Sequence, residues 1–318
     1  MSLRQWLGAM PWAGLAGLLV AASPAVMYAS SPPGPELQQA IQAWRQAPYR
    51  QTQSSAEVSL SVAWQAAYAR SPAWTQLAQK LARDGQLALF RAEDDVWQVN
   101  GKQAESYTCA GSTGNASVFW FGGAAYEKEQ GGWVSTPSSP ALWNPVLGAW
   151  TSPRLASQGG SEDEVVAVMS AASAQATFGP WVAGVVGSAL FGGRGMSKSD
   201  LQALLAHTTV YGHFAISRAS AVPQLQSATV AAVIGVPASV VAHALGDKAA
   251  SAVRSMTWRM DWTMKTSYLH LSQPLPQGLH PAGWPSPGSG NSIGSGTSGD
   301  NATQSSNETA GGSLQNGT

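Results

Sequence analysis

The chain has 318 residues, of which only 11% are charged, and lysine and arginine balance aspartate and glutamate to a net charge of zero. An average soluble domain carries about 25% charged residues. This composition provides no basic face for nucleic acid, so nucleic acid is excluded as a partner. The single cysteine, Cys109, excludes an intramolecular disulfide and is expected to be a small buried hydrophobe.

The two ends differ in composition from the rest. Residues 1–30, "MSLRQWLGAMPWAGLAGLLVAASPAVMYAS", have one basic residue and then an apolar stretch, which is typical of a secretory signal peptide. The stretch is also long enough for an uncleaved N-terminal membrane anchor. Residues 285–318 are rich in Gly, Ser, Asn and Thr, which predicts a disordered tail. We therefore expect an extracytoplasmic protein, secreted or associated with the cell envelope, with one folded domain at residues 31–284.

The folded part opens with a helix followed by a strand. Leu37, Ile41 and Trp44 share one face at helical spacing, which predicts the helix. Apolar and polar residues then alternate from 57 to 65, the pattern of a strand in an antiparallel sheet covered on one side only. Residues 71–85 predict a second, short helix, with a serine cap and a glycine stop.

Residues 87–136 predict a meander of short antiparallel strands. Asn100 and Gly101 form a two-residue turn between two of these strands. The acidic run from Glu93 to Asp95 suits a further turn between strands.

The stretch "YEKEQGGWVSTP", which begins at Tyr126, predicts the tip of a β-hairpin. We expect strands 118–126 and 132–135 around a turn from Lys128 to Gly131, where paired glycines permit positive φ angles. Charges exposed at the tip protect it from pairing with other chains. Tyr126 and Trp133 are expected to approach each other across the ladder.

Residues 140–207 predict a helical insertion. Ser161 and Glu164 form a capping box that opens one helix, and Ser197 and Asp200 open another in the same way. Between them, "GPWVAGVVGSALFGG" predicts an apolar helix that is too short to span a bilayer.

Strands return after residue 207 and end in the clearest pattern of the chain. Val210, Phe214 and Ile216 share one face of "TTVYGHFAIS", and in "TWRMDWTMK" tryptophan and methionine alternate with polar residues. Such alternation again predicts strands with one buried and one solvated face.

Tryptophan is unusually abundant, with 14 residues in the chain. Core packing is one explanation, and the other is a pocket that accepts an apolar chain or stacks sugar rings. We expect the apolar ligand-binding side chains to be Trp64, Trp120, Trp181, Trp258, Met260, Trp262 and Met264.

The sequence contains no recognisable catalytic motif. No serine nucleophile elbow of the type GxSxG occurs in the folded part. The five histidines form neither HxH nor HExxH, so no metal site is indicated. We therefore expect a protein that is not an enzyme and that uses neither cofactor nor metal.

Three stretches resemble the LolA/LppX-like lipoprotein-carrier superfamily: "AAYEKEQGGWV", "LQALLAHTTVYGHFAIS" and "WRMDWTMKTSYLHLSQP". The resemblance covers about residues 36–276 and implies a curved sheet whose concave side is covered by helices, around an apolar cavity for acyl chains. The chain departs from the lipoprotein members because no lipobox cysteine follows the signal, and because it has the insertion at 140–207.

The expected fold class is α+β, a curved antiparallel β-sheet (half-barrel) with helices covering the concave face. The expected function is to bind an apolar, lipid-like molecule between sheet and helices, with a membrane surface as a second partner. The alternative is an envelope glycan-binding or structural module that uses its tryptophans. The sequence leaves the oligomeric state open.

Overall fold

The computed structural model describes residues 34–85, 87–111, 114–136, 143–159, 161–192, 195–270 and 273–285. The chain divides into two units, Met1–Trp284 and Pro285–Thr318, and all described helices and strands belong to the first. The predicted signal peptide or anchor, residues 1–30, lies outside the described residues, as does the predicted tail beyond Pro285.

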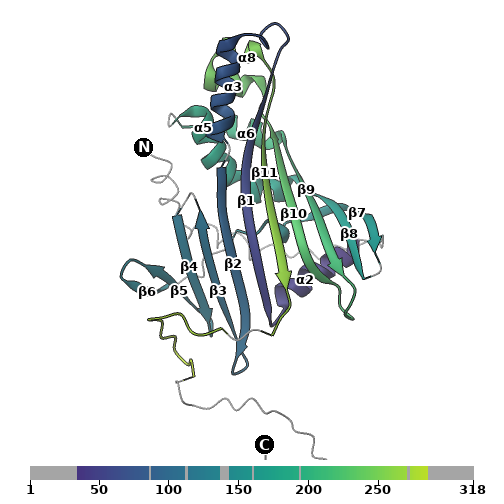
Figure 1. The fold of residues 1–318 in the computed structure, drawn as a ribbon, viewed down its shortest axis with the longest axis vertical. Coiled ribbons are helices and arrows are strands. Elements are labelled where there is room, and N and C mark those ends of the chain that lie inside the picture. Colours follow the sequence, from purple (N-terminus) through teal and green to yellow (C-terminus); the bar gives the residue numbers. More distant parts are fainter. Residues whose placement is uncertain are drawn as a thin grey trace, which may run out of the picture. The chain divides into compact units, whose positions relative to one another are not determined.

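The described strands form one open antiparallel sheet of eleven strands, in the order β6-β5-β4-β3-β2-β1-β11-β10-β9-β8-β7 (Figure 1). Their bounds are β1 Arg50–Trp64, β2 Leu87–Val99, β3 Lys102–Gly111, β4 Gly114–Phe121, β5 Ala124–Glu129, β6 Gly132–Thr136, β7 Trp150–Gly159, β8 Glu162–Met169, β9 Thr208–Ser217, β10 Gln224–Gly235 and β11 Val253–Ser267. The sheet does not close, and β6 and β7 are its edges. The first strand therefore pairs with the last at the centre of the sheet.

The described helices lie mainly against one half of the sheet. Their bounds are α2 Gly34–Gln46, α3 Pro72–Gly85, α4 Ala171–Trp181, the π-helical segment η3 Val182–Val186, α5 Gly187–Phe191, α6 Lys198–Ala206, α7 Ala238–Leu245 and α8 Asp247–Ala252, with a short 3₁₀ turn, η2, at Pro145–Leu147. Helix α2 packs on β10, β9 and β7, α4 on β9, α6 on β10, α3 on β1 and α8 on β11. None of the described helices is both long enough and apolar enough to cross a membrane.

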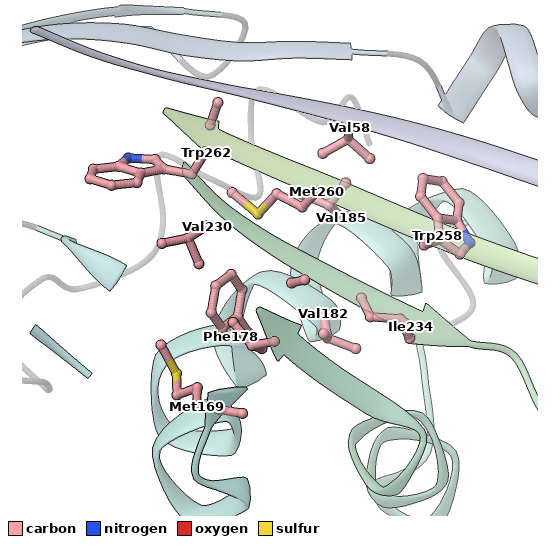
Figure 2. Close-up of a cluster of buried hydrophobic side chains, with 14 of the residues drawn as sticks. Val58, Met169, Phe178, Val182, Val185, Val230, Ile234, Trp258, Met260 and Trp262 are labelled. Atoms are coloured by element: carbon pink, nitrogen blue, oxygen red, sulfur yellow. The ribbon is translucent and has the colours of Figure 1, made fainter. Parts of the chain in front are cut away.

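The two faces of the sheet differ because its strands alternate. In β11, the even-numbered residues from Met256 to Thr266 are buried, and most of the odd-numbered ones are exposed. We call the face that carries these even-numbered residues the inner face, and the opposite one the outer face. Trp258 lies between Leu60 of β1 and Ile234 of β10, and this part of the inner face packs against Phe178, Val182 and Val185 (Figure 2). The predicted α+β fold, a curved antiparallel sheet with helices on one face, is confirmed.

The prediction of a helix from Ser161 is wrong, because Glu162–Met169 forms strand β8. Asp163, Val165, Ala167 and Met169 are buried in alternation, and the strand pairs with both β7 and β9. A serine followed three residues later by glutamate therefore marks no helix start here. Within the predicted insertion at 140–207, helix begins only at α4 and runs through η3 to α5 without interruption.

The acidic run Glu93–Asp95 does not form the expected turn, since it lies inside the continuous strand β2. Each of its carboxylates has a polar partner: Gln51 for Glu93, Arg50 for Asp94 and Gln273 for Asp95. Pairing of this kind is what permits charge in a half-buried strand. The predicted turn at Asn100-Gly101 is present, and both residues have positive φ angles, 50° and 73°.

The hairpin around residue 130 forms, but its first strand is shorter than expected. Gly122 and Gly123, with φ angles of 60° and 87°, make a turn that separates β4 from β5. Strands β5 and β6 then pair around Gln130-Gly131, and Lys128 and Glu129 are exposed while Glu127 is half-buried. Tyr126 and Trp133 pack in one apolar cluster, as expected for a pair near the tip.

Candidate ligand-binding face

Four of the predicted ligand-binding residues lie side by side on the inner face of β11. Trp258, Met260, Trp262 and Met264 are each at most 2% exposed and belong to the main core (Figure 2). Helices and neighbouring strands fill the space around them, so in this structure they serve as core. The indole N–H groups of Trp258 and Trp262 are buried and have no hydrogen-bond partner.

The other three predicted residues lie at separate places. Trp181, at the end of α4, is half-buried and packs against the main core. Trp64, at the end of β1, is half-buried, and its ring centroid lies 5.0 Å from that of Trp74. Trp120 is half-buried on β4. The structure thus places Trp181 against the same core as the β11 group and leaves Trp64 and Trp120 apart.

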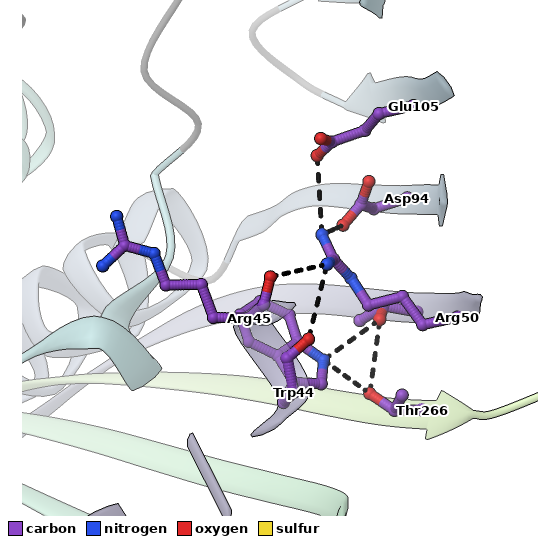
Figure 3. Close-up of polar contacts among 7 residues, drawn as sticks. Trp44, Arg45, Arg50, Asp94, Glu105 and Thr266 are labelled. Carbon is purple, nitrogen blue, oxygen red and sulfur yellow. Dashed lines mark hydrogen bonds and ion pairs between the residues drawn. The ribbon is translucent and has the colours of Figure 1, made fainter. Parts of the chain in front are cut away.

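A buried polar cluster lies where β1 begins. Nη2 of Arg50 is 2.9 Å from Oδ2 of Asp94 on β2 and 3.5 Å from Oε1 of Glu105 on β3 (Figure 3). Nη1 of Arg50 donates to the main-chain carbonyls of Trp44 and Arg45, both at 3.4 Å, and the guanidinium lies 4.7 Å from the centre of the Trp44 ring. Arg50 is only 5% exposed, so the end of α2 and the three strands enclose its charge.

The environment of Glu105 favours the protonated form of its carboxyl group. Burial first, and then the charge of Asp94, raise its pKa to about 8, while Arg50 opposes the shift. Arg50 and Asp94 then form the ion pair of this cluster, and Glu105 adds a neutral carboxyl group. One donor, Nε of Arg50, and one acceptor, Oδ1 of Asp94, remain buried without a hydrogen-bond partner.

An apolar strip continues from the polar cluster across β3 and β4. Directly paired residues share a face of an antiparallel sheet. Tyr107 stands opposite both Asp94 and Val118, and Trp120 stands opposite Glu105, so all of these share the inner face. Val118 is buried, and Tyr107 and Trp120 are half-buried. Because the described helices pack mainly on β1 and β7 to β11, this strip lies beside the helix-packed core.

Ionisation of the titratable side chains on the inner face of β3, in and beside the strip, is disfavoured. Burial raises the pKa of the Tyr107 hydroxyl and of the Cys109 thiol, which is the next inner-face residue of β3. Both groups therefore remain neutral at physiological pH. The strip is accordingly suited to apolar contact, with the Arg50 cluster at one end and half-buried Glu127 of β5, which pairs with Val118, at the other.

Sequence reasoning did not find the polar cluster. Arg50 and Asp94 are 44 residues apart, and Arg50 and Glu105 are 55 apart, so no spacing motif joins them. One signal was present: Arg50 shares the parity of Ala56 and Val58, whose side chains point to the buried face. A charged residue at a buried parity predicts a charged partner, although not which one.

A pocket of about 760 Å³ lies on the outer face and crosses β4, β3, β2, β1, β11 and β10. Inner-face residues also line it, but Ala92, Ala228 and Met264 are buried from the other side of the sheet, so the side chains that project into it are those of the outer-face residues beside them. These are mainly polar: Gln53, Ser55, Arg91, Glu93, Thr108, Ser117, Ser227, Thr229, Thr263 and Lys265. Such walls do not suit an acyl chain.

A second polar cluster joins α6 to α7. Oγ of Ser197 donates to Oδ2 of Asp200 at 2.6 Å, and Nδ1 of His243 lies 2.8 Å from the same oxygen. The predicted Ser197 cap is confirmed, since its hydroxyl also accepts from the Asp200 N–H at 3.1 Å. The carboxylate stands between serine and histidine, whereas a serine nucleophile needs the histidine beside it. Among the described residues, no group of three or more His, Cys, Asp and Glu side chains could hold a metal ion.

These features define an open-sheet α+β protein with helices on one half of the inner face and an apolar strip with one polar end on the other half. No protein-family model matches the chain, and no curated protein matches it. A comparison with solved structures finds a LolA superfamily protein from Nitrosomonas europaea, at 10% identity and a TM-score of 0.21, covering 73% of this chain and 92% of that chain. A TM-score this low supports no argument about the ligand.

The raised pKa of Glu105 makes stability depend on pH. Unfolded glutamate loses its proton near 4.5 and folded Glu105 near 8, so the folded state holds more protons between these values, and the free energy of unfolding falls as pH rises through this window. We expect this fall, measured by urea denaturation between pH 5 and 8.5, to be smaller in Glu105→Gln by on the order of 1–3 kcal/mol. An identical pH dependence in the two proteins would contradict the assignment.

Proposed function

We propose that this protein is an exported, non-enzymatic binder of an amphiphilic, lipid-like molecule on the inner face of β2 to β4. One observation carries the proposal: the apolar strip of Tyr107, Val118 and Trp120 leads directly into the enclosed Arg50–Asp94–Glu105 cluster. An acyl chain would lie along the strip, where half-buried aromatic and aliphatic side chains favour apolar contact. The head group would lie at the cluster.

The chemistry of the cluster limits which head groups can bind there. Since Arg50 and Asp94 neutralise each other and the protonated form of Glu105 is favoured, a strongly charged head group would find no free counter-ion. A hydroxyl or ester group can accept from Nε of Arg50, and a hydroxyl can also donate to Oδ1 of Asp94, the two atoms without partners. An uncharged hydroxyl-bearing lipid, such as a monoacylglycerol, is therefore the ligand class we propose.

Binding is tested on the full chain with the uncharged glycerol monoester of dansyl-labelled undecanoic acid. We expect saturable, blue-shifted emission with wild type and at least tenfold weaker affinity with Trp120→Ala, because that change removes the largest side chain of the strip. Tyr211→Ala is the matched control, since Tyr211 is 50% exposed on the outer face. Absence of uptake, or equal affinity of wild type and Trp120→Ala, would refute the proposal. Extraction of the native protein followed by mass spectrometry identifies the lipid.

The alternative of glycan stacking on tryptophan has less support. It requires a row of exposed indole rings, whereas Trp258 and Trp262 are buried beneath helices and strands. Binding of the protein to a glycan array should therefore be unchanged when either tryptophan is replaced.

A further inference from the structure

The outer face of β2 to β6 carries a second apolar cluster that the proposed lipid site does not use. We call it the outer aromatic cluster and define it as Trp97, Phe119, Phe121, Tyr126 and Trp133. Trp97, Phe119 and Phe121 are at most 2% exposed. A sheet face that would otherwise meet solvent needs a cover to bury rings to this degree.

The cover is the segment Gln273–Trp284, which follows the last strand and which we call the strap. Its Leu275, Leu279 and Trp284 pack into the cluster. The ring centroid of Trp284 lies 4.9 Å from that of Phe121 and 5.8 Å from that of Phe119. The strap reads "QPLPQGLHPAGW", with three prolines among twelve residues.

Few polar bonds hold the strap. Its described backbone hydrogen bonds are internal, Leu279 N–H to Pro276 O at 3.1 Å and Trp284 N–H to Pro281 O at 3.2 Å. To the sheet it donates from Nε2 of Gln273 to Oδ2 of Asp95 at 3.2 Å. An element held mainly by a few side chains opens locally at low free-energy cost.

The cluster also contains hydrogen-bond donors that the strap does not pair. The indole N–H groups of Trp97 and Trp133 are buried and have no hydrogen-bond partner. In aromatic sites that recognise proline-rich peptides, rings pack on the proline side chains and a tryptophan N–H can donate to a peptide carbonyl. A peptide with suitably placed carbonyls would satisfy donors that the strap does not reach.

We propose that the outer aromatic cluster is a recognition site for proline-rich apolar peptides, occupied in cis by the chain's own strap, which is releasable. The strap is covalently attached, so its high effective concentration keeps the site filled without tight intrinsic affinity. A proline-rich segment of a partner protein that also satisfies the indole donors would displace it.

The test uses the full chain with Trp284→Ala, which weakens the strap, and a labelled synthetic peptide with the sequence of residues 273–285. Hydrogen exchange is expected to become fast in the strap while β2 to β5 stay protected. The peptide is expected to bind the variant at least tenfold more tightly than wild type, where the strap competes. A peptide with its prolines replaced by alanine should bind at least tenfold more weakly than the parent peptide.

Three results would overturn the proposal. Loss of protection throughout β2 to β5 in Trp284→Ala would make the strap an integral part of the fold. Failure of the peptide to bind the variant would remove the recognition site. Equal binding of the proline-free peptide would remove the specificity. Tyr211→Ala serves as the control variant, and it should bind no more peptide than wild type.

Discussion

Replacing Trp258 with alanine is expected to lower the free energy of unfolding by about 3–5 kcal/mol. The indole is 1% exposed and lies between Leu60 and Ile234 on the inner face. Its removal leaves a cavity that strands on both sides and the helices above cannot fill without moving. Urea denaturation followed by circular dichroism measures the loss.

The control for this prediction is Tyr211→Ala, which removes an aromatic ring from the exposed outer face of β9. Its effect should stay within about 0.5 kcal/mol, as for ordinary surface positions. If both variants lose the same stability, the assignment of the inner face as the core is incorrect.

Replacing Arg50 with methionine is expected to cost about 3–5 kcal/mol, because Asp94 then remains buried without its counter-ion. Methionine preserves most of the apolar length of the side chain, so the loss reports charge more than packing. Adding Asp94→Asn to this variant should recover at least about 1 kcal/mol, since the amide removes the unpaired charge. Chemical denaturation at neutral pH measures all three proteins.

Arg259→Met provides the matched comparison. Arg259 also forms an ion pair, with Asp261 at 2.8 Å, but its side chain is 53% exposed. Exposed pairs contribute about 0–1 kcal/mol, so this variant should be nearly as stable as wild type. Equal losses in the Arg50 and Arg259 variants would show that enclosure of Arg50 has no energetic consequence.

Strands in which apolar and polar residues alternate strictly could be predicted from the sequence. Strand β8 could not. In β11 every inner residue from Met256 to Met264 is apolar, so alternation is visible without a structure. In β8 the inner residue Asp163 is 1% exposed and forms an ion pair with Arg218, beyond the end of β9. Because its partner Arg218 is distant in sequence, the burial of Asp163 could not be expected from the sequence. The acidic residues after Ser161 therefore resembled the first turn of a capped helix.

The candidate site was harder to predict than the fold. Alternation correctly placed Trp258 and Trp262 on a buried face, but it could not show that helices fill the space above them. That depends on which half of the sheet the helices cover, a property of tertiary contacts. Trp120 was named from the sequence, whereas its neighbours Arg50 and Glu105 became apparent only once β1, β2 and β3 were aligned in register.

The pairing of β1 with β11 has a consequence for how the chain acquires its structure. Arg50–Trp64 finds its central partner only in Val253–Ser267, about two hundred residues later. Contacts this distant in sequence slow folding, because a long loop must close before they form. During synthesis the middle of the sheet cannot assemble until the final strand has left the ribosome. Until then one edge of β1 presents unpaired backbone N–H and C=O groups, to which strands of other chains can pair.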